Sequence, residues 1–245
     1  MPGKPFIVQL TRKLERHAPL LEADKSFLAG CIDQVVAYDR GETIIAEGSS
    51  PSVSCFVVEG FAARTKELAD GTRQIMAFHI PGDFCDLHSF LLAVMDHSVE
   101  ALSPCRVAKV SHAKIEEIVK TLPNLTKALW RDMGADAAIH RQWMVSMGRR
   151  SSYEQIAHLL CEMLLRLRAV GLATGNTYEL PLTQQDLGDA FGLSTVHVNR
   201  MLQALRRGNL IVTKGKQLYI PDVRALAEAA AFDATYLGAG LLPSA

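Results

Sequence analysis

Hydrophobic residues between positions 34 and 111 occur in short runs, and turn-forming residues interrupt these runs at close intervals. The interruptions contain glycine, aspartate, serine or proline. Many short strands separated by glycine-bearing turns predict a small antiparallel barrel or roll. The predicted strands are VVAY at 35–38, TIIAE at 43–47, SCFVVE at 54–59, FAARTKE at 61–67, RQIMAFHI at 73–80 and CRVAKV at 105–110.

The pattern becomes helical after residue 111. His112–Thr121 has a helical composition, and 124–148 contains no proline and one internal glycine, which predicts a single long helix. A further helix begins near Ser151, where Glu154 lies three residues after a possible capping serine. We interpret Gly148–Arg150, between the two long helices, as a hinge.

The long helix carries two apolar stripes. One follows a seven-residue repeat typical of a two-stranded coiled coil, and it contains Thr126, Trp130, Met133, Ala137, His140, Met144 and Met147. The neighbouring stripe is expected to face the helix's own barrel, and it contains Leu125, Leu129, Ile139 and Trp143, with Asp132 and Asp136 among them. We therefore predict a homodimer through the 124–148 helix. The alternative is a helix buried within a monomer.

The segment from Gln184 to Gln203, QQDLGDAFGLSTVHVNRMLQ, is typical of a helix-turn-helix. Gly188 is small enough to let the two helices approach, and Gly192 suits a turn with a left-handed backbone. The predicted apolar wedge between the helices consists of Leu187, Phe191, Leu193, Val198 and Met201. Two short strands around Lys214–Lys216 would then form a wing.

The same segment predicts which side chains contact DNA. Thr183 and Ser194 are expected to cap the two helices, and the second helix would present its outer face to the major groove. Arg206, Arg207 and the basic residues of the wing and the hinge would mainly contact phosphate. The predicted DNA-binding residues are Thr183, Gln184, Ser194, Thr195, Val196, His197, Asn199, Arg200, Lys214 and Lys216.

Nearly the whole chain resembles the family of the cyclic-AMP receptor protein and Fnr. The resemblance rests on RGETIIAEG, FVVEGFA and IPGDF with their turn glycines Gly41, Gly60 and Gly82, on the long helix, and on LTQQDLGDAFGLSTVHVNRMLQALRRGNLI. It implies an α+β chain: a double-stranded β-helix (jelly-roll) sensor at 1–121, a dimerisation helix and hinge at 122–149, and a winged helix-turn-helix with a tail at 150–245. The expected partners are double-stranded DNA with two-fold symmetry, a second copy of the chain, RNA polymerase and a small-molecule effector.

The resemblance also assigns base contacts. Arg200 matches the arginine that reads a guanine in the family, and Thr195, Val196 and Asn199 match the other recognition positions. Many members have a glutamate where Val196 stands, and that carboxylate can accept a hydrogen bond from a cytosine amine. Valine cannot, so we expect a different operator.

The sensor half departs from the cyclic-nucleotide members, which carry a Gly-Glu-Leu segment and later an arginine that pairs with the phosphate. In this chain Asp86, Leu87 and His97 stand at the glycine, glutamate and arginine positions. A cyclic phosphate would lose a cation and meet a carboxylate. We therefore predict that the effector is not cyclic AMP, and that it binds among Asp86, Leu87, His88, His97, Ser98 and His140. For His140 an ordinary interface histidine is the alternative.

Two cofactors of the family fit the sequence poorly. An Fnr-type iron–sulfur cluster requires several cysteines before the barrel, where only Cys31 lies. Cys85 and His88 loosely resemble the ligands of haem in carbon-monoxide sensors, but their spacing is one residue longer. We expect no cofactor and keep haem at Cys85 and His88 as the alternative.

Composition limits the other classes of function. The 245 residues suggest two domains, and 26 basic residues balance 26 acidic ones, so net charge indicates no partner. Five cysteines without a CxxC pair indicate a reducing compartment. The lack of a signal peptide or an 18-residue apolar stretch predicts a cytoplasmic protein that does not enter a membrane.

Two rival functions differ from a DNA-binding regulator. One is a ligand-binding module that acts through protein contacts, its winged helix having lost DNA binding. The other is an enzyme, but the sequence shows no nucleophile–base pairing, phosphate loop or metal-ligand spacing. We therefore predict no catalytic residue and no metal site.

Overall fold

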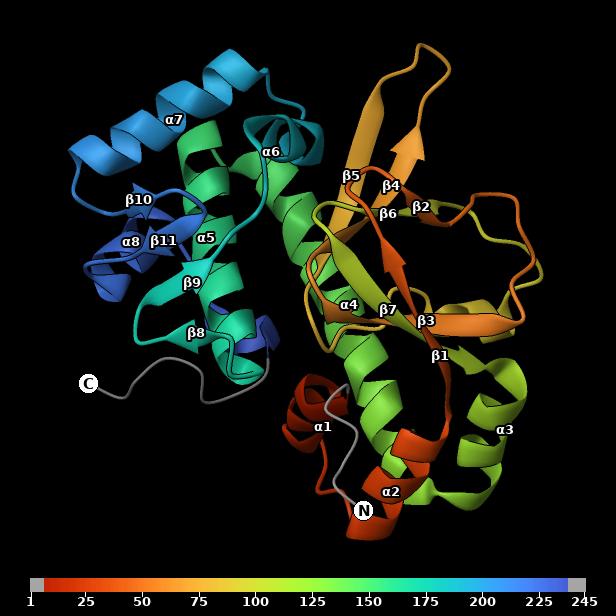
Figure 1. Ribbon diagram of the computed structural model, residues 1–245. Helices are drawn as coiled ribbons and strands as arrows, with labels where there is room; N and C mark the ends of the chain where they lie inside the picture. The colour runs from red at the N-terminus through yellow and green to blue at the C-terminus, as the bar shows by residue number, and fades with distance from the viewer. Residues whose placement is uncertain (1–6, 238–245) are drawn as a thin grey trace. The chain divides into compact units, whose positions relative to one another are not determined.

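The computed structural model describes residues 7–237, and the chain forms two compact units that divide between Gly134 and Ala135. The division falls inside α4 (Pro123–Arg149), a continuous helix of 27 residues that the sequence predicts over 124–148. In Figure 1 the first unit runs from red to green and the second from green to blue. Each unit has a hydrophobic core of its own.

Two antiparallel sheets make up the β-structure of the first unit, one in the order β1-β7-β3 and the other in the order β2-β6-β4-β5. The six predicted strands are all present, and β6 is a seventh that the sequence analysis missed. With the helices, they confirm the α+β class. The strands are β1 (Ile32–Tyr38), β2 (Thr43–Ile45), β3 (Val53–Glu59), β4 (Ala62–Glu67), β5 (Arg73–His79), β6 (Ser98–Ala101) and β7 (Cys105–Ser111).

Two turns of this unit require glycine. Gly60, between β3 and β4, has a φ of 79°, and a Cβ atom there would lie 2.2 Å from the carbonyl oxygen of Pro104. Gly82 has a φ of 96°, and its Cβ would lie 2.9 Å from the backbone of Gln9. Both the backbone conformation and the close approach exclude other residues, because only glycine lacks the Cβ.

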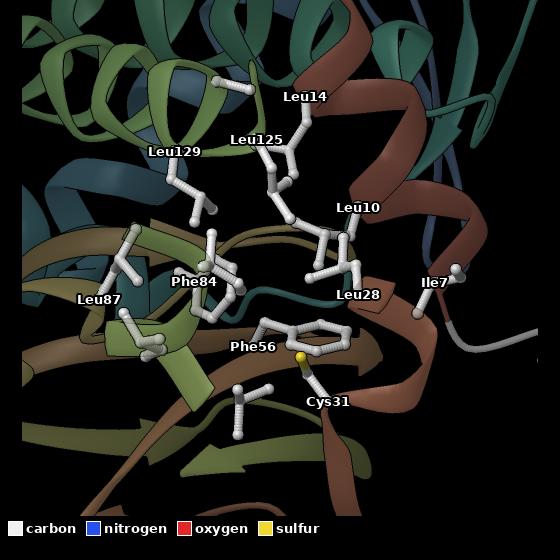
Figure 2. Packing of buried hydrophobic residues seen from close by; sticks show 14 of the residues in the cluster. Ile7, Leu10, Leu14, Leu28, Cys31, Phe56, Phe84, Leu87, Leu125 and Leu129 are labelled. Atoms are coloured by element: carbon white, nitrogen blue, oxygen red, sulfur yellow. The ribbon is translucent and has the colours of Figure 1, made fainter. Parts of the chain in front are cut away.

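Helices pack on the sheet β1-β7-β3 to form the larger core of the first unit. Helices α1 (Val8–Glu15) and α2 (Glu22–Gly30), which the sequence analysis did not predict, precede the strands, and α3 (His112–Thr121) follows them as predicted. Figure 2 shows how the side chains from α1, α2, α4 and the sheet meet. The labelled core residues are Ile7, Leu10, Leu14, Leu28, Cys31, Phe56, Phe84, Leu87, Leu125 and Leu129.

The predicted inner stripe of α4 serves two cores rather than one. Leu125 and Leu129 lie in the core of the first unit, as expected. Ile139 packs in a core of the second unit, and the Trp143 ring lies 5.6 Å from that of Phe191, also in the second unit. The expectation that all four residues face the barrel is therefore wrong, because the helix passes from one unit into the other.

An aspartate within that stripe is explained by an ion pair. Lys13 on α1 lies 2.7 Å from Asp132 of α4 and 2.7 Å from Asp83. Burial lowers the pKa of this lysine, but the two carboxylates outweigh burial and raise the pKa above its usual range. Lys13 is therefore positively charged, and its two ion pairs connect α1 to α4 and to the turn after β5.

The second unit consists of α5, a small antiparallel sheet in the order β10-β11-β9-β8, and three further helices. Ser151 and Glu154 form the predicted capping box, which starts α5. Residues 155–165 and Leu167 of α5 are buried, so it is the central helix of this unit. The elements of the second unit after α4 are α5 (Ser152–Ala169), β8 (Ala173–Thr174), β9 (Thr177–Glu179), α6 (Gln184–Phe191), α7 (Thr195–Arg207), β10 (Val212–Lys214), β11 (Gln217–Tyr219) and α8 (Val223–Ala229).

The segment after the wing packs back on α5. Asp222 caps α8 by accepting hydrogen bonds from the backbone NH groups of Arg224 and Ala225. A short 3₁₀ helix, η3 (Ala234–Leu237), follows. Its Tyr236 hydroxyl donates to the Glu162 carboxylate of α5 at 2.9 Å. Leu226, Ala230, Ala234 and Leu237 of this segment are buried, so the segment after the wing contributes to the core of the second unit.

Candidate nucleic-acid interface and sensor site

The helix-turn-helix begins and turns where the sequence predicts. The Thr183 hydroxyl accepts from the Asp186 NH at 3.1 Å, and the Asp186 carboxylate accepts from the Thr183 NH at 2.8 Å. This capping box starts α6, and the Ser194 hydroxyl starts α7 by accepting from the His197 NH at 3.2 Å. Gly192 closes α6 with a left-handed φ of 67°.

The close approach of α6 to the turn that precedes α7 depends on Gly188. A Cβ atom at this position would lie 2.4 Å from the carbonyl oxygen of Leu193, so no other residue fits without a shift. Of the predicted wedge, Leu187, Phe191 and Val198 are buried, while Leu193 and Met201 are half-buried. Leu202 and Leu205 are also buried, although the sequence analysis did not include them.

The outer face of α7 is open to solvent. Thr195 and Arg200 are exposed, Val196 is 78% exposed, and Asn199 is half-buried with its side-chain oxygen accepting from Gln203 at 2.9 Å. Gln184, from α6, joins Thr195, Val196 and Asn199 around a shallow hollow of about 260 Å³. The four residues that line the hollow were all predicted DNA contacts, and they form one continuous surface.

Arg200 is held by its neighbours before any ligand binds. Its guanidinium donates to His197 Nδ1 at 2.9 Å, and His197 Nε2 lies 2.6 Å from the Ser152 hydroxyl on α5. An arginine can only donate, so Nδ1 is the acceptor and the neutral ring carries its proton on Nε2. Half-buried His197 therefore positions Arg200, and Ser152 supports His197 from behind. Sequence reasoning missed Ser152, since it lies 45 positions away.

The predicted wing is a hairpin of β10 and β11. Val212 pairs with Tyr219 and Lys214 with Gln217, and Gly215 at the tip has a φ of 60°. Lys214 and Lys216 flank this glycine and are both exposed. The hairpin thus presents two ammonium groups to solvent.

In the first unit, the predicted effector residue Asp86 points into the protein. Its carboxylate accepts hydrogen bonds from the Cys55 NH at 2.6 Å and from the Ser89 hydroxyl at 3.1 Å. Burial raises the pKa of Asp86 to about 6, against the opposing effect of these bonds and of Arg64. Leu87 is equally inaccessible, since it lies in the core shown in Figure 2.

The remaining candidates separate into two places. His88 on η2 (Leu87–Leu91) and His97 before β6 lie side by side, with ring centroids 5.4 Å apart and the ring planes tilted by 38°. Next to His97, the Ser98 hydroxyl accepts from the Glu47 NH at 3.0 Å. His140 lies instead on the part of α4 that belongs to the second unit, with Nδ1 3.9 Å from the Asp136 carboxylate.

Asp96 is a site residue that the sequence analysis did not select. Its carboxylate lies 2.7 Å from His97 Nδ1, and this hydrogen bond holds the pKa of Asp96 below its usual value. One ligand atom from each of His88, Asp96 and His97 lies within 4.8 Å of the others. We expected no metal site from the sequence because the three residues show no familiar ligand spacing, but the turn between η2 and β6 brings them together.

Family models and known proteins match the chain in both units. A cyclic nucleotide-binding domain model matches residues 35–121, and a Crp-like helix-turn-helix domain model matches residues 154–229. The nitrogen fixation regulation protein FixK of Bradyrhizobium diazoefficiens is 30% identical over 197 residues, which cover 80% of this chain and 82% of FixK. The chain belongs to the Crp/Fnr family of DNA-binding transcription regulators.

Other relatives and solved structures agree with this assignment. The transcriptional activator protein FnrL of Cereibacter sphaeroides is 29% identical over 201 residues, 80% of each chain. The structure of FixK2 from Bradyrhizobium japonicum has a TM-score of 0.72 at 27% identity, over 80% of this chain and 96% of FixK2. A CRP-family transcriptional regulator from Thermus thermophilus has the same fold, with a TM-score of 0.57 at 19% identity over 85% of this chain and all of the other.

The residues of this Crp/Fnr regulator do not fit two ligands of the family. At the positions that would surround a cyclic phosphate, Asp86 adds a buried carboxylate and Leu87 is part of the core. A cluster-binding set of cysteines is also lacking, since Cys31 is a core residue and the other four cysteines are buried further along the chain.

Within residues 7–237, no helix combines the length and apolar character needed to cross a bilayer.

Proposed function

We propose that two copies of this chain bind a two-fold symmetric DNA operator and read it with α7. The observation that carries the proposal is the exposed surface of Gln184, Thr195, Val196 and Asn199 beside a pre-oriented Arg200. An arginine fork can donate to both O6 and N7 of guanine, a contact that contributes about 1–3 kcal/mol of base discrimination. Lys214 and Lys216 would contact phosphate beside it.

The experiment begins with selection of duplexes from a random pool by the purified full chain. Arg200→Ala should weaken binding to the selected duplex by about ten- to a hundredfold, with little change on unrelated DNA. Lys216→Ala is the matched control: it should weaken binding to both duplexes alike and reduce the salt dependence by about one charge. Equal binding of Arg200→Ala and the wild type to the selected duplex would contradict the proposed role.

A dimer through α4 is supported by an unpartnered apolar surface on that helix. Trp130 is 64% exposed, Met144 69% and Met147 44%, and all three belong to the predicted coiled-coil stripe. Trp130→Ala should raise the dissociation constant of the dimer at least tenfold in sedimentation experiments, because large aromatic residues dominate such interfaces. Leu68→Ala, another exposed apolar residue outside the helix, should leave it unchanged.

We infer that the effector is not cyclic AMP and that no haem is bound. The first inference is supported by Leu87 and His97, which stand where the cyclic-nucleotide members have a glutamate and a phosphate-binding arginine, and calorimetry should detect no micromolar binding of cyclic AMP. The second is supported by Cys85, which is fully buried with its thiol pKa raised by burial, so a thiolate ligand is disfavoured. Added haem should therefore produce no Soret band.

Other expectations stay predictions. Contact with RNA polymerase, a cytoplasmic location and the lack of catalysis rest on the sequence and on membership of a family of regulators. The rival module without DNA binding gains nothing from the comparisons, since the relatives are named as transcriptional activators and regulators.

A further inference from the structure

The turn between η2 and β6 gathers three potential metal ligands in the first unit. His88 comes from η2, while Asp96 and His97 immediately precede β6. One ring nitrogen from each histidine and one carboxylate oxygen lie within 4.8 Å of one another. Imidazole and carboxylate groups are the usual protein ligands of divalent first-row transition metals.

The backbone on both sides of the cluster is fixed. On one side, the Ser89 NH donates to the Asp86 carbonyl at 2.7 Å within η2. On the other, β6 pairs with β2 and β4, and Met95, which is 1% exposed, donates its NH to the Ser49 carbonyl at 2.9 Å. A metal ion would therefore not have to order the chain first, which lowers the entropic cost of binding.

The geometry is close to that of a bound site. A tetrahedral ion with bonds of about 2.0–2.1 Å separates its ligand atoms by roughly 3.3 Å, so movement of the side chains by about 1–2 Å would complete the set. His97 is 5% exposed and supplies a buried wall, whereas Asp96 is exposed and His88 half-buried, which leaves an entry from solvent. Three protein ligands would leave the remaining positions to water.

A nearby cation does not block the site. Lys66 donates its ammonium proton to the backbone carbonyl of Asp96 at 2.9 Å, so it holds the turn rather than the carboxylate. The same ammonium group is paired with Glu47, which offsets its charge. The Asp96 carboxylate therefore remains directed to His97 and available to an ion.

We propose that His88, Asp96 and His97 bind one divalent first-row transition metal ion, and that this ion is the effector of the regulator proposed above. The second part rests on the proposed function, whereas the first does not. Binding would draw η2 toward the start of β6, and an ion that binds one conformation more tightly shifts the population toward it.

Cobalt is the probe of choice for the full chain, because Co²⁺ accepts the same ligands as Zn²⁺ and absorbs visible light. We expect saturation at one Co²⁺ per chain, and affinity at least tenfold weaker in His88→Gln and in Asp96→Asn. His17→Gln is the matched control, a half-buried histidine whose Nε2 lies 3.6 Å from the Asp132 carboxylate, outside the cluster, and it should bind Co²⁺ as the wild type does. Asp96 is exposed, so Asp96→Asn should fold.

Three results would overturn the metal site: no saturable Co²⁺ binding, equal affinity in the wild type and both variants, or the near-ultraviolet absorption of a cobalt–thiolate bond. The last would place the ion on one of the cysteines, all of which are buried. Because absorption is measured without DNA, these results are independent of the proposed function.

The effector role is tested on the selected duplex. Saturating Co²⁺ should change the affinity of the wild type for this duplex at least fivefold and leave that of His88→Gln unchanged, as expected for coupling between two sites. Binding of Co²⁺ with no change in duplex affinity would overturn the effector role. If the chain binds Co²⁺ but no duplex under any condition, the proposed function fails while the metal site stands.

Discussion

The two units differ in how far their candidate functional side chains are exposed to solvent. In the second unit, the side chains proposed to read DNA lie on the open face of α7, where Val196 is 78% exposed. In the first, His97 just before β6 is 5% exposed and Asp86 just before η2 is fully buried, although Asp96 between these two elements is exposed. Substitutions on α7 should therefore change recognition without changing stability, whereas substitutions of the two buried groups should change stability.

Each unit also contains a buried ionisable group with a shifted pKa, and the two shifts have opposite effects on stability as the pH falls. His158 on α5 stacks on Tyr236 and meets Phe232 edge-on, and burial, with help from Arg150, lowers its pKa to about 4. Asp86 in the first unit has its pKa raised to about 6. Acid should thus weaken the second unit through His158 and strengthen the first through Asp86. We therefore expect the stabilities of the two units to change in opposite directions as the pH falls.

The largest expected effect is the loss of Trp143 from the second unit. This side chain is 3% exposed, its ring packs on Phe191, and its Nε1 donates to the Glu162 carboxylate at 3.3 Å. Trp143→Ala should lower the free energy of unfolding by about 3–5 kcal/mol, measured with urea. Trp143→Phe keeps one aromatic ring but removes the Nε1 donor and part of the packed surface, so it should cost less, about 1–2 kcal/mol. Equal losses in the two variants would mean that the ring contributes nothing by packing.

The next effect concerns His158 and acid. Between pH 6.5 and about 4 the unfolded histidine binds a proton that the folded one does not, so the second unit should lose about 3–4 kcal/mol as the pH falls through this window. His158→Leu should abolish this loss. Unfolding is followed by Trp143 fluorescence in a Trp130→Phe background. The same slope in wild type and variant would show that another group titrates.

Asp86 should have a slightly smaller effect in the opposite direction. The folded carboxyl keeps its proton up to about pH 6, while the unfolded one loses it near 3.8, so its contribution to stability is complete below 3.8 and declines as the pH rises to 6. Relative to Asp86→Asn, the wild type should lose about 3 kcal/mol over this range. Trp130 fluorescence in a Trp143→Phe background reports on the first unit. A constant difference across the range would contradict the buried carboxyl.

How far the sequence predicts each unit follows from the range of the interactions. The helix-turn-helix depends on contacts between residues close in sequence, such as Thr183 with Asp186 and Gly188 with Leu193. A segment of 20 residues is therefore enough to predict its caps, its turn and its exposed face. The hydrogen bond between His197 and Ser152 joins residues 45 positions apart, and the sequence does not predict it. The sequence therefore predicts the recognition helix, which depends on local contacts, but not Ser152, which supports it from a distant part of the chain.

In the first unit the sequence predicted the strands but not the direction of the side chains between them. Asp86 was expected in a pocket, yet its carboxylate satisfies the Cys55 NH, a partner 31 positions away that no spacing reveals. Strand β6 was missed because its four residues, with Ser98 and Glu100 among them, form a strand only through pairing with β2 and β4. The cluster with Asp96 depends on that same pairing.

The smallest expected effect tests the open face of α7 directly. Val196→Glu places a carboxylate acceptor where the chain has an exposed valine, and a cytosine amine in the major groove can donate to it. Repeating the duplex selection should show a gain in preference for cytosine at one position of each half-site, by about 1 kcal/mol, while the guanine assigned to Arg200 stays preferred. The urea midpoint should not change, because exposed substitutions alter stability by less than about 0.5 kcal/mol. An unchanged base preference would place Val196 outside the contact surface and confine recognition to the rest of the helix.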